Sequence, residues 1–231
     1  MLKNTQINRI TTVKIAKALG ELNLRVLYVG GAVVSLYIDD PSAEDVRPTK
    51  DIDLSLEIAS LGELESLRQE LYNKGFSQSH EDNVVCRFRY EDIKVDVMGT
   101  KPIGWAPANP WFEKGFPYKK RIKLDTTEIF ILPLPYFLAT KFTAFNDRGK
   151  KDPRTSHDFE DIVYLLNYTS KLSEEINATS LVLKSYLKEE FQNILDSEIM
   201  QEAILANLFY EEQDIRFNLI ISKLKEMITL I

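Results

Sequence analysis

Three aspartates have the residue type and spacing best suited to chemistry in this sequence. Asp51 and Asp53 are one residue apart in a run of alternating polar and apolar residues, and Asp96 lies in a second such run. Alternate side chains of a strand share a face, so Asp51 and Asp53 should lie about 6–7 Å apart on one side. If the two strands pair, Asp96 can join them.

Three carboxylates at close range repel one another, and each raises the pKa of its neighbours. A divalent cation removes that conflict, and hard oxygen ligands suit Mg²⁺ or Mn²⁺, which keep positions open for substrate phosphates. Two such ions can hold the attacking and leaving oxygens of a phosphoryl or nucleotidyl transfer. A lone Asp-x-Asp is more often a polar strand face, but the trio predicts metal-dependent transfer.

Gly30 and Gly31 follow a short β-rich run at residues 25–29. Glycine permits close backbone approach, and a helix beginning at this turn would offer unpaired N–H groups to phosphate. A glycine pair is usually only a turn. Followed along the chain by Asp51 and Asp53, it predicts a triphosphate cradle in the same site.

The elements that must position these residues change character near residue 130. Short β-rich runs alternate with helical patterns before it, and helical patterns follow it. This order predicts an α+β fold, with a sheet and helical cover in residues 1–132 and a C-terminal helical domain in residues 133–231. The expected strands are 25–29, 51–56, 83–90, 92–98 and one or two within 119–131. The expected helices are 8–21, 32–38, 62–74, 136–147, 158–169, 172–195 and 198–228.

Composition and charge restrict the function classes. The 231 residues are 44% hydrophobic, and the net charge is 29 − 35 = −6. Residues 114–154 carry ten basic and four acidic side chains, or +6, so the rest of the chain carries −12. This strip is compatible with a phosphate-bearing ligand or with a solvated basic hairpin. The single cysteine, Cys86, excludes an intrachain disulfide and is expected in the core.

No segment predicts secretion or membrane insertion. The N-terminus lacks an apolar signal core, and the longest apolar run, at residues 129–140, contains two prolines. That run is far shorter than the roughly 20 residues that span a bilayer. We therefore expect a soluble, cytoplasmic protein without a membrane partner.

At these residues the sequence resembles the nucleotidyltransferase superfamily with the DNA polymerase β-like fold. The superfamily pattern is Gly-Gly or Gly-Ser, then two acidic residues in Asp/Glu-x-Asp/Glu, then a third acidic residue on a later strand. Gly30-Gly31, Asp51 with Asp53, and Asp96 match it. The resemblance implies a nucleotidyltransferase-type mixed sheet.

More narrowly, the sequence is similar to the AbiEii-type toxin nucleotidyltransferases. Residues 47–53, RPTKDID, resemble the Arg-x-Thr-x-Asp-hydrophobic-Asp form of that branch. Lys141 with Ala144, then Arg148, then DFEDI at 158–162 resemble its Lys-x-x-Ala…Arg…Asp-x-x-Asp-hydrophobic signature, although the segment after Arg148 is longer than in the family. A tRNA CCA-adding enzyme is disfavoured because residues 32–35, AVVS, replace its Arg-Asp.

The resemblance implies a role for each matching residue. Asp51 and Asp53 would hold metal and triphosphate, and Asp96 would bind metal and help to deprotonate the acceptor hydroxyl. The implied nucleotide-binding set is Gly30, Gly31, Arg47, Thr49, Lys141, Arg148, Asp158 and Asp161. The plainer alternatives are a solvated helix face for Lys141 and Arg148, and first-turn helix charge for Asp158 and Asp161.

The implied activity is transfer of a nucleoside monophosphate from an NTP to an acceptor hydroxyl, on an RNA such as a tRNA or on a protein. The resemblance also implies the toxin half of a bacterial toxin–antitoxin or phage-defence pair, with a cognate antitoxin. Two alternatives remain open: a small-molecule, aminoglycoside-type nucleotidyltransferase, and a catalytically idle nucleotide-binding or interaction module. Trp105 and Trp111 either stack an acceptor base or belong to a packed loop.

Overall fold

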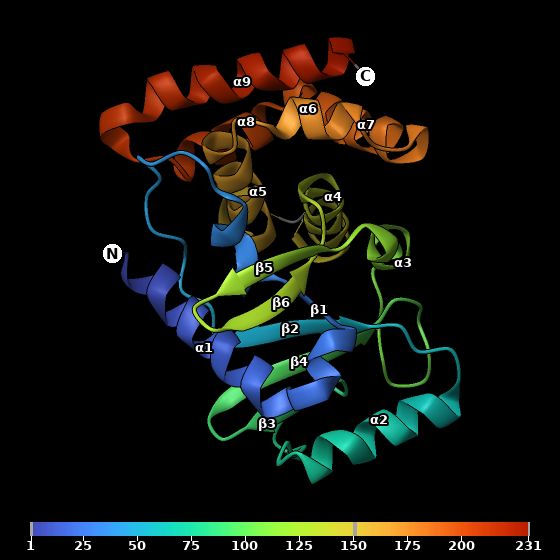
Figure 1. Ribbon diagram of the computed structural model, residues 1–231. Helices are drawn as coiled ribbons and strands as arrows, with labels where there is room; N and C mark the ends of the chain where they lie inside the picture. Colours follow the sequence, from blue (N-terminus) through green and yellow to red (C-terminus); the bar gives the residue numbers. More distant parts are fainter. Residues whose placement is uncertain (1, 150–151, 231) are drawn as a thin grey trace. The chain divides into compact units, whose positions relative to one another are not determined.

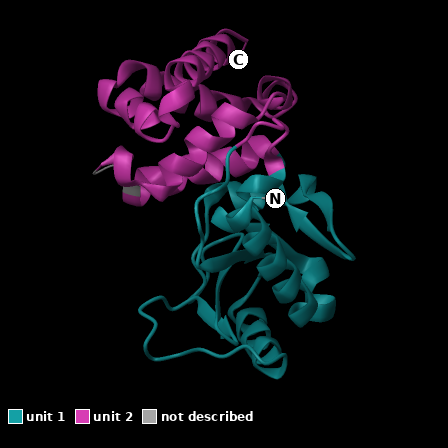
Figure 2. Ribbon diagram, turned by 90° about the vertical axis from the view of Figure 1, so that its left-hand side faces the viewer, with its two compact units in different colours: residues 1–36, 44–133 teal, residues 37–43, 134–231 magenta. Residues whose placement is uncertain are grey.

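The fold is described from a computed structural model over residues 2–149 and 152–230, and it divides into two compact units. Unit 1 comprises residues 1–36 and 44–133, and unit 2 comprises residues 37–43 and 134–231 (Figure 2). Residues 37–43, which the sequence analysis assigned to the first domain, lie in unit 2.

Within the described residues, six strands of unit 1 form one sheet in the order β3-β4-β2-β1-β6-β5 (Figure 1). The pairs β1–β6 and β2–β4 are parallel, and the other neighbours are antiparallel. The expected mixed sheet of an α+β fold is thus confirmed. The strands are β1 Val26–Val29, β2 Asp51–Leu56, β3 Arg87–Tyr90, β4 Ile93–Gly99, β5 Lys120–Leu124 and β6 Thr127–Ile131.

The core of unit 1 follows from period-2 alternation. Ile52 and Leu54 of β2 are buried and lie opposite Val95 and Val97 of β4, which are buried as well. The aspartates between these residues must therefore face the other side of the sheet. β1 is buried along its whole length, as expected of a central strand.

The helices of unit 1 support this sheet. α1 lies across one of its faces (Figure 1), and α2 begins where the Ser60 side chain accepts a hydrogen bond from the Glu63 N–H. The α-helices are α1 Lys3–Leu19, α2 Leu61–Asn73 and α3 Pro110–Gly115. The 3₁₀ segments that begin in this unit are η1 Gly20–Arg25, η2 Gly31–Tyr37 and η3 Phe116–Tyr118.

The segment after the glycines differs from the prediction. The expected helix at 32–38 is the 3₁₀ helix η2, Gly31–Tyr37, whose tighter turns follow directly on Gly30. Gly30 has φ +72°, a conformation that favours glycine. The turn therefore offers close backbone approach but no α-helical N-terminus.

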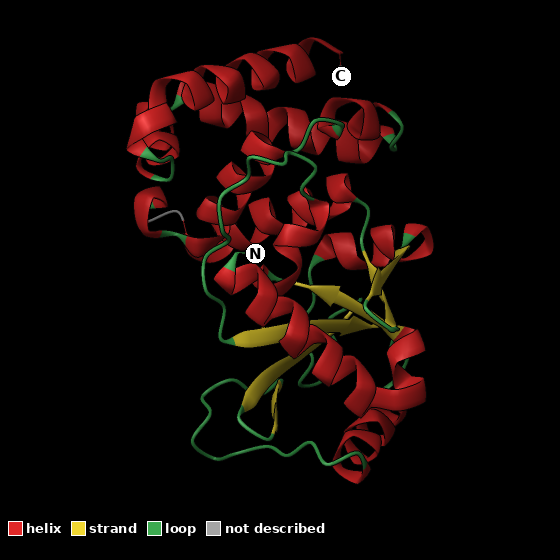
Figure 3. Ribbon diagram, turned by 60° about the vertical axis from the view of Figure 1, so that its left-hand side comes forward, coloured by secondary structure: helices red, strands yellow, loops and turns green. Residues whose placement is uncertain are grey.

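Unit 2 is helical in its described part (Figure 3). α4 packs against α5, α6 and α7, and it continues into a π-helical turn, η4. The α-helices are α4 Leu134–Ala144, α5 His157–Tyr168, α6 Leu172–Asn177, α7 Leu181–Asp196, α8 Glu198–Ala206 and α9 Gln213–Leu230. The shorter segments are η4 Phe145–Gly149, η5 Pro153–Thr155 and η6 Tyr210–Glu212.

Two long helices predicted from the sequence are broken. The helix expected at 172–195 is interrupted before α7, where the Ser180 side chain accepts a hydrogen bond from the Leu183 N–H. The helix expected at 198–228 is interrupted after Ala206, and the Asn207 side chain donates back to the Ala203 carbonyl. Ser180 begins a new helix and Asn207 ends one, so capping by short polar side chains divides segments that apolar periodicity alone would make continuous.

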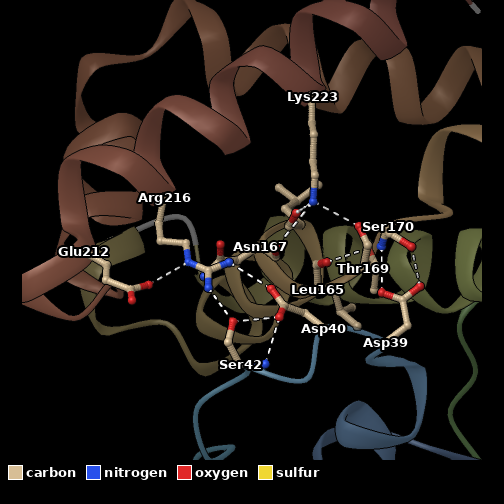
Figure 4. A network of polar contacts seen from close by, with 11 residues as sticks. Asp39, Asp40, Ser42, Leu165, Asn167, Thr169, Ser170, Glu212, Arg216 and Lys223 are labelled. Atoms are coloured by element: carbon tan, nitrogen blue, oxygen red, sulfur yellow. Dashed lines mark hydrogen bonds and ion pairs between the residues drawn. The ribbon is translucent and has the colours of Figure 1, made fainter.

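A polar network holds residues 37–43 within unit 2 (Figure 4). Arg216 of α9 donates to Asp40 at 2.9 Å and to the Ser42 hydroxyl at 2.7 Å. Asp39 accepts hydrogen bonds from the backbone N–H and hydroxyl of Ser170. Lys223 donates to three carbonyl groups at the end of α5, which satisfies acceptors that a helix end leaves unpaired.

No helix of the described ranges is both long and apolar enough to cross a bilayer.

Candidate active site

Asp51, Asp53 and Asp96 share one face of the sheet of unit 1. β2 and β4 are adjacent and parallel, and Asp53 lies directly opposite Asp96 in their register. Asp51 and Asp53 alternate with the buried Ile52 and are themselves only partly buried. The convergence expected from the sequence is therefore present, because strand pairing joins two local patterns.

The glycine turn lies against the same carboxylates. A Cβ placed on Gly30 would come within 1.8 Å of Asp53 Oδ2, so only glycine allows this approach. A Cβ on Gly31 would meet Arg47 Nη2 at 2.5 Å and Thr49 Oγ1 at 3.3 Å. The fold thus gathers glycines and loop residues around one edge of the aspartate face.

Thr49 connects this loop to β2. Its hydroxyl donates to Asp51 Oδ1 at 3.2 Å. Arg47 and Thr49 are both partly buried, so neither side chain is a freely solvated loop residue. In unit 1, the nucleotide-binding residues expected from the sequence therefore lie beside the expected metal ligands.

Arg87 is a site residue that the sequence analysis missed. It lies opposite Asp96 in the β3–β4 register, and its Nε and Nη2 each donate to Asp96 at 2.7 Å. Nη2 also lies 3.4 Å from Asp51 Oδ2. The hydrogen bonds to Asp96 raise the pKa of the Arg87 guanidinium above its usual value. The hairpin expected from strands 83–90 and 92–98 carried part of the signal, and the observed register pairs Arg87 directly with Asp96.

The donor set suits a hard divalent cation in chemical type and in sharing one face of the sheet. Three carboxylates face one side of two paired strands, and a guanidinium already bridges two of them, so the position attracts positive charge. As the side chains stand, no group of three His, Cys, Asp or Glu residues in the described chain is arranged to hold a metal ion. The residues fit the metal, and Arg87 takes part of the space and charge that a metal would need.

The second half of the expected nucleotide-binding set lies in unit 2. Lys141 of α4 donates to Asp161 of α5 at 2.6 Å and lies 3.8 Å from Asp158. These three side chains are 4–7% exposed, so the solvated-face alternative for Lys141 is wrong. Arg148, from the π-helical turn, is 74% exposed and donates to both oxygens of Asp158.

This cluster gives Asp158 and Asp161 separate partners. Asp161 pairs with Lys141, whereas Asp158 mainly receives Arg148. The pairing of Asp161 with Lys141 agrees with the expectation that an aspartate orients the lysine. Both acids lie early in α5, where a negative charge also stabilises the helix end.

The remaining candidates from the sequence are the two tryptophans, the single cysteine and the basic strip. Trp111 is 5% exposed and packs within the short helix α3, where the sequence predicted a loop, while the Trp105 indole donates to Glu65 and lies under the Arg68 guanidinium. Cys86 is buried, as expected, and burial raises the pKa of its thiol to about 11.

Within the basic strip, β5 is an edge strand that exposes Lys120, Arg121 and Lys123.

A family model described as "Nucleotidyl transferase AbiEii toxin, Type IV TA system" matches residues 25–230. The chain belongs to the AbiEii nucleotidyltransferase toxin family. The match runs from β1 through α9, so it includes the glycine turn, the aspartate trio and the Lys141 cluster. The resemblance inferred from short motifs is thereby confirmed over most of the chain, and transferase chemistry follows from family membership.

Searches of curated proteins found no significant match to this AbiEii family member. Among solved structures, it is similar to an antigenic nucleotidyltransferase-like protein from Paracoccidioides brasiliensis, at 16% identity and a TM-score of 0.49, over 86% of this chain and 92% of that one. The antibiotic-resistance factor ANT(2'')-Ia gives 17% identity and a TM-score of 0.48, over 83% and 97% of the two chains. JHP933 from Helicobacter pylori gives 14% and 0.44, over 98% and 96%. Likenesses of this size do not extend to activity or substrate.

Proposed function

We propose that this AbiEii-family chain transfers a nucleoside monophosphate from an NTP to an acceptor hydroxyl and thereby acts as a toxin. The observation that carries the proposal is the aspartate face of β2 and β4, with Asp53 directly against the Gly30 turn. Family membership supports the reaction class, and this geometry is our reason for proposing that the reaction occurs in unit 1.

In the proposed reaction the acceptor hydroxyl oxygen forms a bond to the α-phosphorus of the NTP. The bond from that phosphorus to the bridging β-phosphate oxygen breaks, and pyrophosphate leaves with the electron pair. The hydroxyl proton passes to the Asp96 carboxylate. Mg²⁺ or Mn²⁺, held by Asp51, Asp53 and Asp96, would neutralise charge on the phosphates and the attacking oxygen.

The chain's own residues would position the nucleotide in this scheme. The Gly30–Gly31 turn lets the triphosphate approach the backbone closely, and Arg47 and Thr49 flank that turn. Arg47 is suited to phosphate because a guanidinium can donate two parallel hydrogen bonds. In unit 2, Lys141 and Arg148 are proposed as nucleotide-binding residues in their own right, with Asp161 and Asp158 holding their side chains.

We favour an RNA acceptor over a protein or a small molecule. The exposed cations of β5 form a row along a sheet edge, and Lys119 next to them lies over the rings of Phe116 and Phe130. A row of exposed cations suits a phosphate backbone. The toxin–antitoxin family description supports a cognate antitoxin as the second partner.

The test is incubation with each α-³²P-labelled NTP, Mg²⁺ and either total cellular RNA or total protein. We expect the wild type to label RNA, and Asp51→Asn/Asp53→Asn to lower labelling at least about 100-fold, since even supporting residues of a metal site cost 10–100-fold. Asp92→Asn, which removes an exposed carboxylate beyond the site, should label like the wild type. Expression of the wild type, but not of the double variant, should arrest growth.

Equal labelling by the wild type and the double variant would overturn the proposed site. Label found only in protein would support the transferase activity but would overturn RNA as the acceptor in favour of protein. Label only in an added aminoglycoside would favour the small-molecule alternative, and no transfer at all would favour the idle module.

A further inference from the structure

Arg87 forms a fixed ion pair inside the acidic face of the site. Its guanidinium donates two hydrogen bonds of 2.7 Å to the two oxygens of Asp96 and lies 3.4 Å from Asp51. The side chains of Arg87 and Asp96 are 16% and 14% exposed, so solvent screens the pair only in part. The Asp51 side chain is more accessible to solvent, with 33% of it exposed.

A second arginine on β3 pairs with an aspartate outside the site, and this difference sets Arg87 apart. Arg89 is two residues further along β3, and it makes the same kind of two-pronged pair, at 2.7 and 2.9 Å, with Asp82. Asp82 lies outside the aspartate trio. Strand β3 therefore carries two similar ion pairs, of which one engages the site and one does not.

An arginine and a divalent cation compete for the same carboxylates. The pair with Arg87 uses one hydrogen-bonding site on each Asp96 oxygen, and a metal ion beside it would bring two cations into close range. Three carboxylates of the described chain share this face, yet as they stand no three acidic, His or Cys side chains are arranged to hold a metal ion. Metal entry must weaken the contacts of Arg87 to Asp51 and Asp96.

We propose that Arg87 is an internal counter-cation that balances the aspartate face before metal arrives and competes with the metal for Asp51 and Asp96. This inference rests on the proposed function, because it assumes that the trio binds a divalent cation. Arg87 is accordingly a positioning residue, which sets metal affinity through the two aspartates. Its loss should tighten metal binding while destabilising the metal-free protein.

The test is Mn²⁺ binding to the full chain without nucleotide, measured by isothermal titration calorimetry and by the thermal midpoint at increasing Mn²⁺. Arg87→Met keeps the apolar stem and removes the charge. We expect it to bind Mn²⁺ at least about fivefold more tightly than the wild type, the lower end of typical coupling between two sites. Its midpoint should be lower than that of the wild type without Mn²⁺ and should rise more as Mn²⁺ saturates the site.

Arg89→Met is the matched control. It removes an equal charge and an equivalent ion pair from the same strand, so it should lower the thermal midpoint yet leave the Mn²⁺ affinity unchanged. Arg87→Lys retains a cation without the two-pronged geometry, and its Mn²⁺ affinity should lie between those of the wild type and Arg87→Met. This second variant keeps the inference testable if Arg87→Met does not fold.

Wild-type Mn²⁺ affinity in both Arg87→Met and Arg87→Lys would overturn the counter-cation role and leave the proposed function standing. Equal tightening by Arg89→Met would also overturn it, because a general charge effect would then suffice. No Mn²⁺ binding by the wild type or any variant would overturn both the inference and the metal-dependent function.

Discussion

Gly30 and Asp53 show how closely single residues approach one another in the candidate site. Gly30 has φ +72°, and its α-carbon leaves no room for a side chain beside the Asp53 carboxylate. Gly31 has space limited only by the ends of the Arg47 and Thr49 side chains. The two glycines are adjacent in sequence but are required for different reasons.

We therefore expect Gly30→Ala to be the more damaging of two alanine substitutions. Its Cβ would need Asp53 to move and would add backbone strain of about 1–3 kcal/mol. Gly31→Ala would displace chiefly the flexible end of Arg47, so the loss in unfolding free energy should be smaller. Urea unfolding followed by circular dichroism measures both changes. A larger loss for Gly31→Ala would contradict the described turn.

Lys141 and Asp161 form a buried ion pair in unit 2. Each side chain is at most 5% exposed, and the two are 2.6 Å apart. Removing one partner of such a pair commonly costs about 3–5 kcal/mol, because the other charge remains buried. Any ligand that binds Lys141 must therefore take the place of its existing partner, Asp161.

At the scale of elements, the end of α5 is held by groups from two other segments. Lys223 of α9 and Ser170 act at the helix end, and Asp39 and Asp40 bring residues 37–43 to it. The Asp39 and Asp40 backbone N–H groups also donate to the Tyr168 carbonyl. This network satisfies helix-end acceptors that would otherwise need water.

Asp40 makes this network sensitive to acid. Hydrogen bonds from the Ser42 hydroxyl and backbone N–H, together with Arg216, lower the pKa of Asp40 from 3.8 to about 2. A depressed carboxyl pKa means that the unfolded chain binds more protons between these values. The stabilisation is therefore complete above about pH 4 and is lost as the pH falls toward 2.

We expect Asp40→Asn to lower the thermal midpoint at pH 5–7, and the difference from the wild type to vanish near pH 2. Differential scanning fluorimetry across this range measures it. Glu189→Gln, which removes an exposed carboxylate from the middle of α7, is the control and should follow the wild type. A pH-independent difference for Asp40→Asn would contradict the ionic role of Asp40.

At the scale of the whole molecule, the chain passes between the two units more than once. It enters unit 2 at residue 37, returns to unit 1 at residue 44 and enters unit 2 again at residue 134. Tyr37 stacks on Phe137 of α4 with ring centroids 4.4 Å apart. A residue near the glycine turn in sequence therefore contributes to the packing of the helical unit.

Tyr37→Ala should accordingly destabilise unit 2 rather than the sheet. We expect a loss of about 2 kcal/mol, since aromatic stacking and apolar burial are both removed. Hydrogen exchange followed by mass spectrometry should show faster exchange in α4 and α5, with β2 and β4 protected as in the wild type. Tyr210→Ala, at a position of unit 2 whose residue is 87% exposed, should change neither. Faster exchange confined to β2 and β4 would contradict the assignment of Tyr37 to unit 2.

Local patterns predicted the strands, their faces and the family. The alternation of β2 and β4 places Asp51, Asp53 and Asp96 on one side because side-chain direction in a strand depends only on position along it. Short motifs were enough to identify the AbiEii family, which the match over residues 25–230 confirmed.

Tertiary structure decided what depends on partners distant in sequence. Strand register placed Arg87 between Asp96 and Asp51, and helix packing paired Lys141 with Asp161. Packing also assigned residues 37–43 to unit 2. Composition and periodicity describe each segment in isolation, whereas charge pairing and burial arise only when separate segments meet, so these features were determined by the folded molecule.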